Sequence, residues 1–164
     1  FMNIHSIQPQ DIPACLDLYN YYIQNTCFTL EESPLSLDAF RTRVHKVTER
    51  YPFIVAQDEH GTVLGFAYLS VFNERSAYRH TADLSIYVHK DHMHQQVGSA
   101  LYRAIETLAR QQGITNLISI ITNVNPVSLR FHEKQGFIQE GHLKTVAFKM
   151  NQTIDIYYYR KRLE

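Results

Sequence analysis

Apolar and polar positions recur along this chain with two different periods, and these periods predict where its strands and helices lie. Between Thr81 and Val88 every second residue is apolar, which is the pattern of a strand with one apolar face. Between Gly98 and Gln112 apolar residues recur every three or four positions, which predicts a helix. The loop between them leads into a helix N-terminus, where backbone N–H groups and the positive helix end face an anion. This segment therefore predicts a turn that holds a phosphate.

The same criteria predict the other elements. In chain order they are a strand over 3–7, helices over about 12–25 and 37–47, a hairpin of strands over 53–57 and 63–72, a strand over 117–121, a short helix opening at Asn125-Pro126 and closed by Gly136, and strands beginning at 137 and covering 154–159. The run 117–121 is continuously apolar, which is typical of a strand buried on both faces. Strand, helix and strand in this order predict a right-handed parallel crossover. The order indicates an α/β, mixed α+β fold in one domain, residues 2–164.

Composition limits the classes of function. Of the 164 residues, 45% are hydrophobic and 20% are charged, and the formal net charge is zero, as in ordinary globular proteins. The sequence has no excess of basic residues, so we expect no nucleic-acid partner. No apolar run is long enough to span a bilayer, so we expect a cytoplasmic protein without a membrane partner. Cys15 and Cys27 show no CxxC spacing and are expected to be free thiols.

Four segments together resemble a known family. They are YNYYIQNTCFTLEESPLSL in the first sixty residues, AYRHTADLSIYV at 77–88, NVNPVSLRFHEKQGF at 123–137, and AFKM followed by ID near the C-terminus. In this order they resemble the GNAT superfamily of N-acetyltransferases, and within it the phosphinothricin and methionine sulfone or sulfoximine acetyltransferases. The resemblance implies a central mixed, largely antiparallel twisted sheet with helices on both faces. It also implies a homodimer that transfers an acetyl group from acetyl-CoA to the primary amine of a small amino-acid-like substrate.

The family's pyrophosphate loop, Q/R-x-x-G-x-G/A, corresponds here to Met93–Gly98, in which only the last glycine is kept. Gln96 carries a Cβ where the pattern has glycine, which penalises a positive φ. Backbone N–H groups supply most of the binding, so we expect acetyl-CoA binding to be kept but weakened. The cofactor-binding residues implied by the resemblance are Ile86, Tyr87, Val88, Met93, His94, Gln95, Gln96, Val97, Gly98, Ser99, Asn125 and Ser128. The backbone at 86–88 would pair with the pantetheine amides, and Asn125 has an alternative role as a plain helix N-cap.

Acetyl transfer to an amine requires a base for the ammonium proton and an acid for the leaving thiolate. Asp83 corresponds to a glutamate proposed as general base in the resembling enzymes; being one methylene shorter, it would act directly or through a water. Its alternative is a structural carboxylate in an ion pair or cap. His132 occupies the position of a general acid that is tyrosine in many members; its alternative is a helix-surface histidine. A strand N–H near Tyr87 or Val88 would hold the oxyanion.

Arg75 and Tyr78 correspond to the segment that recognises the substrate carboxylate, where a guanidinium fork suits bidentate binding; a solvated loop arginine is the alternative. Two other classes of function compete. His89, His92 and His94 with Asp91 carry metal-binding side chains, but their spacing matches no tight tetrahedral motif, so no metal is expected. The degenerate loop would also suit a protein that keeps the fold and only binds a ligand or regulates.

Overall fold

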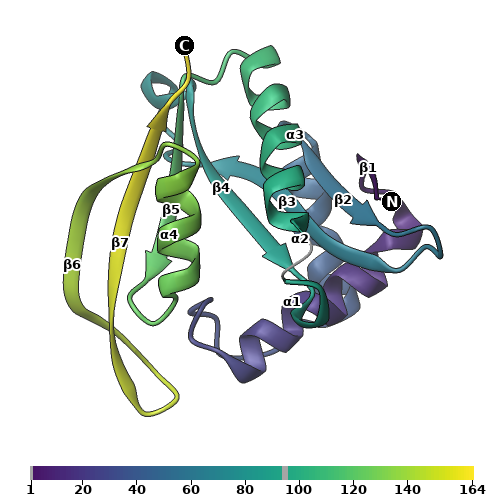
Figure 1. Ribbon diagram of the computed structural model, residues 1–164, viewed down its shortest axis with the longest axis horizontal. Coiled ribbons are helices and arrows are strands. Elements are labelled where there is room, and N and C mark those ends of the chain that lie inside the picture. Colours follow the sequence, from purple (N-terminus) through teal and green to yellow (C-terminus); the bar gives the residue numbers. More distant parts are fainter. Residues whose placement is uncertain (1, 94–95) are drawn as a thin grey trace. The chain divides into compact units, whose positions relative to one another are not determined.

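The computed structural model describes residues 2–93 and 96–164 of the chain, in which the elements follow the predicted order. They are β1 (Asn3–Ser6), α1 (Ile12–Asn25), α2 (Leu37–Thr48), β2 (Phe53–Gln57), β3 (Val63–Val71), β4 (Thr81–Val88), α3 (Val97–Gln111), β5 (Asn116–Thr122), α4 (Pro126–Lys134), β6 (Ile138–Lys149) and β7 (Gln152–Arg162), with short 3-10 turns at Pro9–Asp11, Ser76–Tyr78 and Lys90–His92. The strands follow one another in the sheet as β1-β2-β3-β4-β5-β7-β6 (Figure 1). The pair β4–β5 is parallel, and the pairs β1–β2, β2–β3, β5–β7 and β6–β7 are antiparallel. The predicted mixed, largely antiparallel fold is confirmed.

The chain forms two compact units, each assembled from three stretches of sequence. Unit 1 contains the chain up to Asn20, Leu35–Ser70 and Leu84–Gly113, and unit 2 contains Tyr21–Pro34, Val71–Asp83 and Ile114–Glu164. The boundary falls inside β4, between Asp83 and Leu84. Because neither unit is a continuous stretch of sequence, neither corresponds to a domain that could be excised; the single domain over 2–164 stays a prediction. Among the described residues, no helix combines the length and apolar character needed to cross a membrane.

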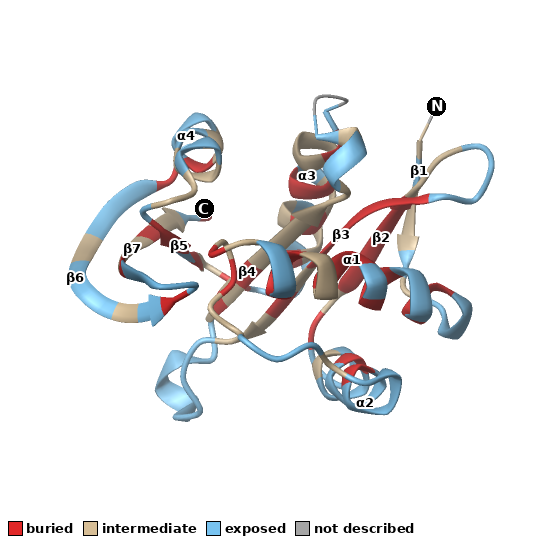
Figure 2. Cartoon of the chain, turned by 90° about the horizontal axis from the view of Figure 1, so that it is seen from below, coloured by how far each residue is buried: buried red, intermediate tan, exposed pale blue. Residues whose placement is uncertain are grey.

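Unit 1 is built around β2 and β3, whose residues are mostly buried (Figure 2). Phe53 of β2 stacks on Phe66 of β3 with ring centroids 5.4 Å apart. Leu101 and Ile105, which the helical period assigned to one face of α3, are fully buried. Ser36 is the N-cap of α2, since its hydroxyl accepts a hydrogen bond from the Ala39 N–H at 3.1 Å. These local signals fixed the helix ends to within a residue or two.

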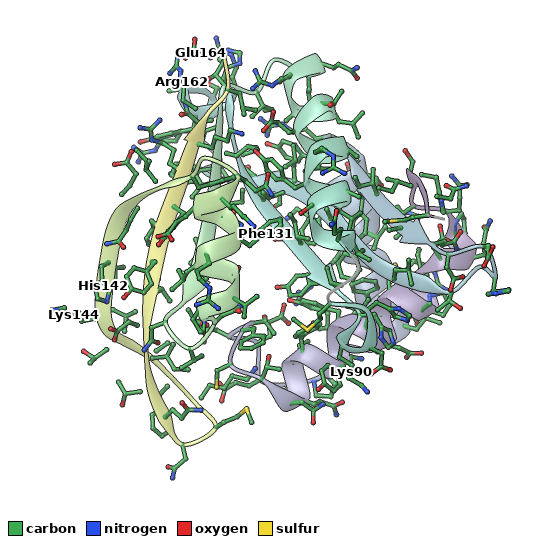
Figure 3. All side chains as sticks on the ribbon, viewed as in Figure 1. Lys90, Phe131, His142, Lys144, Arg162 and Glu164 are labelled. Atoms are coloured by element: carbon green, nitrogen blue, oxygen red, sulfur yellow. The ribbon has the colours of Figure 1, made fainter. Side chains whose placement is uncertain are left out.

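Unit 2 contains the parallel start of β4, together with β5, α4 and the long β6–β7 hairpin. Its hairpin shifts register between Leu143 and Ala147, so extra residues bulge from β6. The carboxylate of Asp155 on β7 anchors this bulge: Oδ1 accepts from the Thr145 N–H at 2.8 Å, and Oδ2 lies 2.9 Å from Nε2 of His142. His142 and Lys144 extend from this part of β6 (Figure 3). Both strands of the hairpin run further than predicted, because exposed polar residues of an outer strand lack a clear alternation.

One prediction about β5 is wrong. The apolar run was expected to be buried on both faces, yet Ile120 in its middle is 49% exposed. Leu117 and Ile121 are buried as expected. Periodicity identifies a strand, but it does not reveal whether a helix covers each of its faces.

Candidate active site

Asp83 lies at the end of the parallel pairing between β4 and β5. Its register partner is Ile118, so the two side chains project from the same face of the sheet. Oδ1 of Asp83 is buried and has no hydrogen-bond partner among the described residues. Loss of hydration therefore raises the pKa of this carboxyl to about 6. The ion pair considered as its structural alternative is not among the described contacts, and a carboxylate with this pKa suits proton transfer near neutral pH.

His132 lies on the opposite face of the same sheet. Its helix, α4, packs over β5 and β7 (Figure 1), where the Tyr159 hydroxyl donates to Oε2 of Glu133 at 2.8 Å. Tyr159 pairs with Ser119, whereas Asp83 shares its face with Ile118, the next residue of β5. The structure thus places the two predicted catalytic side chains on different faces of β4 and β5. A substrate and cofactor that react with both Asp83 and His132 therefore have to reach both faces of the sheet.

The surroundings of His132 also decide which of its nitrogens carries a proton. The ring is buried, with edge contacts to Phe131 and Phe137 at 5.4 and 5.0 Å, so the alternative of a surface histidine is wrong. Nδ1 lies 2.8 Å from the carbonyl oxygen of Ser128; a carbonyl only accepts, so Nδ1 is the donor. Burial lowers the pKa of the imidazole, with the Ser128 bond acting in the opposite direction. The neutral ring presents Nε2 as an acceptor, so it must first gain a proton there before it can act as an acid.

Asn125 serves as the N-cap of α4. Its side-chain oxygen accepts from the Ser128 N–H at 3.3 Å, which is the capping role considered as the alternative. Only the side-chain oxygen of Asn125 takes part in this capping hydrogen bond. The amide nitrogen of Asn125 keeps its two donors, so capping is compatible with the predicted contact to the cofactor arm.

The predicted pyrophosphate segment lies in unit 1, at the start of α3. His94 and Gln95 lie outside the described residues, and the side chain of Met93 is 44% exposed. Gln96 adopts the left-handed conformation, with φ 60° and ψ 21°, and α3 begins at the next residue with Val97, Gly98 and Ser99. The left-handed conformation, which glycine adopts without strain, is therefore adopted here by a residue with a Cβ. This destabilises the fold by about 1 kcal/mol.

Sequence reasoning missed Gly65, which controls the backbone at the end of β4. A Cβ atom on Gly65 would lie 2.7 Å from the carbonyl oxygen of Tyr87 and 3.2 Å from Cα of Val88. The neighbouring Leu64 accepts a hydrogen bond from the His89 N–H at 2.7 Å. A glycine inside a strand pattern often marks such a close approach, and that signal was present in the sequence.

Arg75 and Tyr78, the predicted substrate residues, lie together at a short 3-10 turn of unit 2. Tyr78 is 42% exposed, and its ring meets Phe72 edge-on at 5.7 Å. The Arg75 N–H donates to the side chain of Asn73 at 3.0 Å. Both side chains are exposed, as recognition of a substrate group requires, and their role stays a prediction.

The histidines considered for a metal do not form a cluster in the described part of the chain. The rings of His89 and His92 lie 5.2 Å apart, and Nδ1 of His89 accepts from the Asp91 N–H at 3.1 Å. Within residues 2–93 and 96–164 no three His, Cys, Asp or Glu side chains are grouped to hold a metal, and His94 lies outside these ranges.

A second feature missed from the sequence is a pair of links between the segment after α1 and the end of β6, both in unit 2. The buried ammonium of Lys149 donates to the carbonyl of Thr29 at 2.8 Å, and the Cys27 thiol donates to the carbonyl of Lys149 at 3.6 Å. Desolvation lowers the pKa of Lys149. The partners lie 120 and 122 positions apart, so no local signal reveals them.

Comparison of the sequence with known proteins identifies the family to which this chain belongs. Residues 4–157 match the sequence model of the acetyltransferase (GNAT) domain. Phosphinothricin N-acetyltransferase of Alcaligenes faecalis is 34% identical over 93% of this chain and 78% of its own length. L-methionine sulfoximine/L-methionine sulfone acetyltransferase of Pseudomonas aeruginosa is 30% identical over 94% of this chain and 90% of its own. The chain belongs to the GNAT acetyltransferase family, and it is an acyl-CoA-dependent N-acetyltransferase.

Solved structures of acetyltransferases have the same fold as this chain. The crystal structure of a phosphinothricin acetyltransferase from Sinorhizobium meliloti in complex with AcCoA has a TM-score of 0.95 at 29% identity, covering 99% of this chain and 88% of that one. An N-acetyltransferase from Staphylococcus aureus has a TM-score of 0.96 at 27% identity, covering 100% and 99%. The likeness extends over the whole chain, including both units.

Proposed function

We propose that the protein transfers the acetyl group of acetyl-CoA to the primary amine of a small amino-acid-like acceptor of the phosphinothricin or methionine sulfone/sulfoximine type. The observation that carries this proposal is Asp83, a carboxylate with a buried, unpartnered oxygen and a pKa raised to about 6. The names of the relatives support the acceptor class, and the AcCoA complex from Sinorhizobium meliloti supports the donor.

The chemistry assigns each group one task. Asp83 takes a proton from the acceptor's ammonium, directly or through one water, because its side chain is short. The neutral nitrogen then attacks the thioester carbonyl; the N–C bond forms, the C–S bond breaks, and the thiolate leaves. A backbone N–H near Tyr87 or Val88, further along the same strand, stabilises the oxyanion. Nε2 of His132 takes the second proton, which the nitrogen loses after its attack, and passes it to the leaving thiolate. Arg75 with Tyr78 receives the acceptor's carboxylate.

The cofactor would be held by main-chain groups. The N-terminus of α3, from Gln96 to Ser99, suits the pyrophosphate, and the donors of Asn125 suit the pantetheine arm. The conformation of Gln96 favours a second candidate function, in which a weakly catalytic protein with the same fold binds a ligand or regulates, because its Cβ strains the loop that should hold coenzyme A.

We further propose that residues 2–164 act as one acetyltransferase domain of a cytoplasmic homodimer with no resident metal and no nucleic-acid partner. Exposed apolar side chains on β6, among them Val146 and Phe148 at 52% and 64%, support an interface between copies. Ile154 and Tyr159 of β7 are buried in the core, so they are not available to such an interface.

A thiol-release assay tests the proposal. The protein is incubated with acetyl-CoA and with L-methionine sulfone, phosphinothricin or a panel of other α-amino acids, while coenzyme A and zinc are titrated by thermal shift. Stabilisation by coenzyme A together with turnover of an amino acid supports the enzyme. Stabilisation without turnover supports the ligand-binding alternative, and stabilisation by zinc alone contradicts both.

A further inference from the structure

Ile120 is exposed where a strand interior normally is not. The described pairing of β5 with β4 ends at Asp83 and Ile118, so Ile120, two residues further along β5, has its register partner on β7. The Ile120 side chain is 49% exposed, while Ile118 on the same face is 9% exposed. The register partner of Ile120, Tyr158, is itself only partly buried. The exposed side chain of Ile120 is therefore accessible, just beyond the point where β4 and β5 stop pairing, to a molecule bound beside Asp83.

This surface begins at the proposed base. Asp83 is level with Ile118, and Ile120 follows two positions later on the same face. With a rise of about 3.3 Å per residue and about 4.8 Å between strands, the Cα atoms of Asp83 and Ile120 lie about 8 Å apart. An α-amino acid whose amine meets Asp83, directly or through one water, extends a side chain of methionine size over this distance. The geometry therefore matches the proposed acceptor.

The charges at this place select among such acceptors. One cation on this face is Arg160, which is the register partner of Ile118. Its guanidinium already donates to Glu140 at 2.6 Å and to Asn116 at 3.0 Å. An anionic side chain lying on Ile120 would lose hydration without gaining a free positive partner there. An uncharged side chain gains apolar contact with Ile120 and loses little hydration free energy.

We propose that Ile120 lines the site for the acceptor's side chain and makes the enzyme prefer α-amino acids with an uncharged side chain, such as methionine sulfone, over those with an anionic one, such as phosphinothricin. This inference rests on the proposed function, and it adds the residue that sets specificity. Ile120 acts by contact with the bound acceptor and takes no part in proton transfer.

The test compares Ile120→Lys with Leu37→Lys, a control at an apolar residue of α2 that is 38% exposed. The measured quantity is the ratio of kcat/KM for L-methionine sulfone to kcat/KM for phosphinothricin. The wild type is expected to favour the sulfone, and Ile120→Lys to lower the ratio about tenfold or more, the scale on which one apolar contact discriminates. Leu37→Lys should leave the ratio within about twofold.

Ile120→Ser provides a second variant in case the lysine disturbs folding, which thermal unfolding would reveal; it should lower kcat/KM for the sulfone without changing KM for acetyl-CoA. An equal ratio in the wild type and all variants overturns the inference while leaving the proposed function in place. Sedimentation that shows a changed oligomeric state in Ile120→Lys, with an unchanged ratio, would assign the surface to a second copy instead. A wild type that acetylates no α-amino acid overturns the proposed function, and this inference with it.

Discussion

Gly65 lies so close to Tyr87 that a Cβ atom there would be 2.7 Å from the Tyr87 carbonyl oxygen. A backbone carbonyl cannot swing aside as a side chain can, so Gly65→Ala must displace the end of β4. Because the proposed oxyanion donors are in this backbone, we expect kcat to fall about tenfold or more. KM for acetyl-CoA should rise in the same steady-state measurement.

Gly141→Ala is the matched control for this change. The nearest atoms to a Cβ on Gly141 lie 3.8 and 3.9 Å away on Tyr158, which is ordinary contact. This variant should keep both kcat and KM. If Gly65→Ala is as active as Gly141→Ala, the close approach of Gly65 to Tyr87 is not required for catalysis.

Gln96→Gly should make the protein more stable. Gln96 has φ 60°, which glycine adopts without the penalty of a Cβ, so the free energy of unfolding should rise by about 0.5 to 1 kcal/mol. Gln135→Gly should lower it, because Gln135 has an ordinary φ of −81°. Denaturant unfolding measures both. Calorimetry should also show tighter coenzyme A binding to Gln96→Gly, and equal or weaker binding would remove the explanation for the degenerate loop.

Lys149→Met should make the protein less stable. The substitution keeps the apolar stem but removes the buried hydrogen bond to the Thr29 carbonyl, so the free energy of unfolding should fall by about 1 to 3 kcal/mol. Lys46→Met, at an exposed position of α2, is the control and should change it by less than about 0.5 kcal/mol. Denaturant unfolding measures both variants. Equal stability of the two would mean that the link between Lys149 and Thr29 does not stabilise the fold.

The parts of the fold that the sequence predicted correctly depend on local chemistry. Asn125 was recognised as a candidate N-cap because its side chain can bond to backbone within the same turn, as it does to the Ser128 N–H. Gly136 was identified as a helix end, and it has a positive φ. The strain at Gln96 was also foreseeable, since Gln96 stands where the loop pattern has glycine.

The parts that could not be predicted depend on distant contacts. Nothing near Ile120 in the sequence says that its face is left open, and nothing near Thr29 points to Lys149, 120 positions away. That Oδ1 of Asp83 has no hydrogen-bond partner among residues 2–93 and 96–164 is likewise a property of the folded surroundings. The resemblance suggested which residues to examine; only the structure showed that Asp83 and His132 lie on different faces.

Asp83→Asn should stabilise the protein near neutral pH. The folded pKa of about 6 exceeds the ordinary 3.8, so the unfolded chain ionises first as the pH rises. The free energy of unfolding should therefore fall between about pH 4 and pH 6 and then stay level. Asp83→Asn removes this fall and should gain about 1 kcal/mol at pH 7, allowing for partial solvent access. Thermal or urea unfolding across this range measures it, and a variant that is less stable at pH 7 would mean that the ionised carboxylate has a stabilising partner.

The most direct test of the account is the pH dependence of kcat/KM for the amino-acid acceptor in the wild type, in Asp83→Asn and in the exposed control Asp17→Asn. We predict a limb that rises with an apparent pKa near 6 in the wild type and in Asp17→Asn. Asp83→Asn should lose that limb and about 100-fold or more of its activity at pH 7, the usual contribution of a general base. An Asp83→Asn enzyme that keeps both the limb and the activity would contradict the assignment of Asp83 as the base.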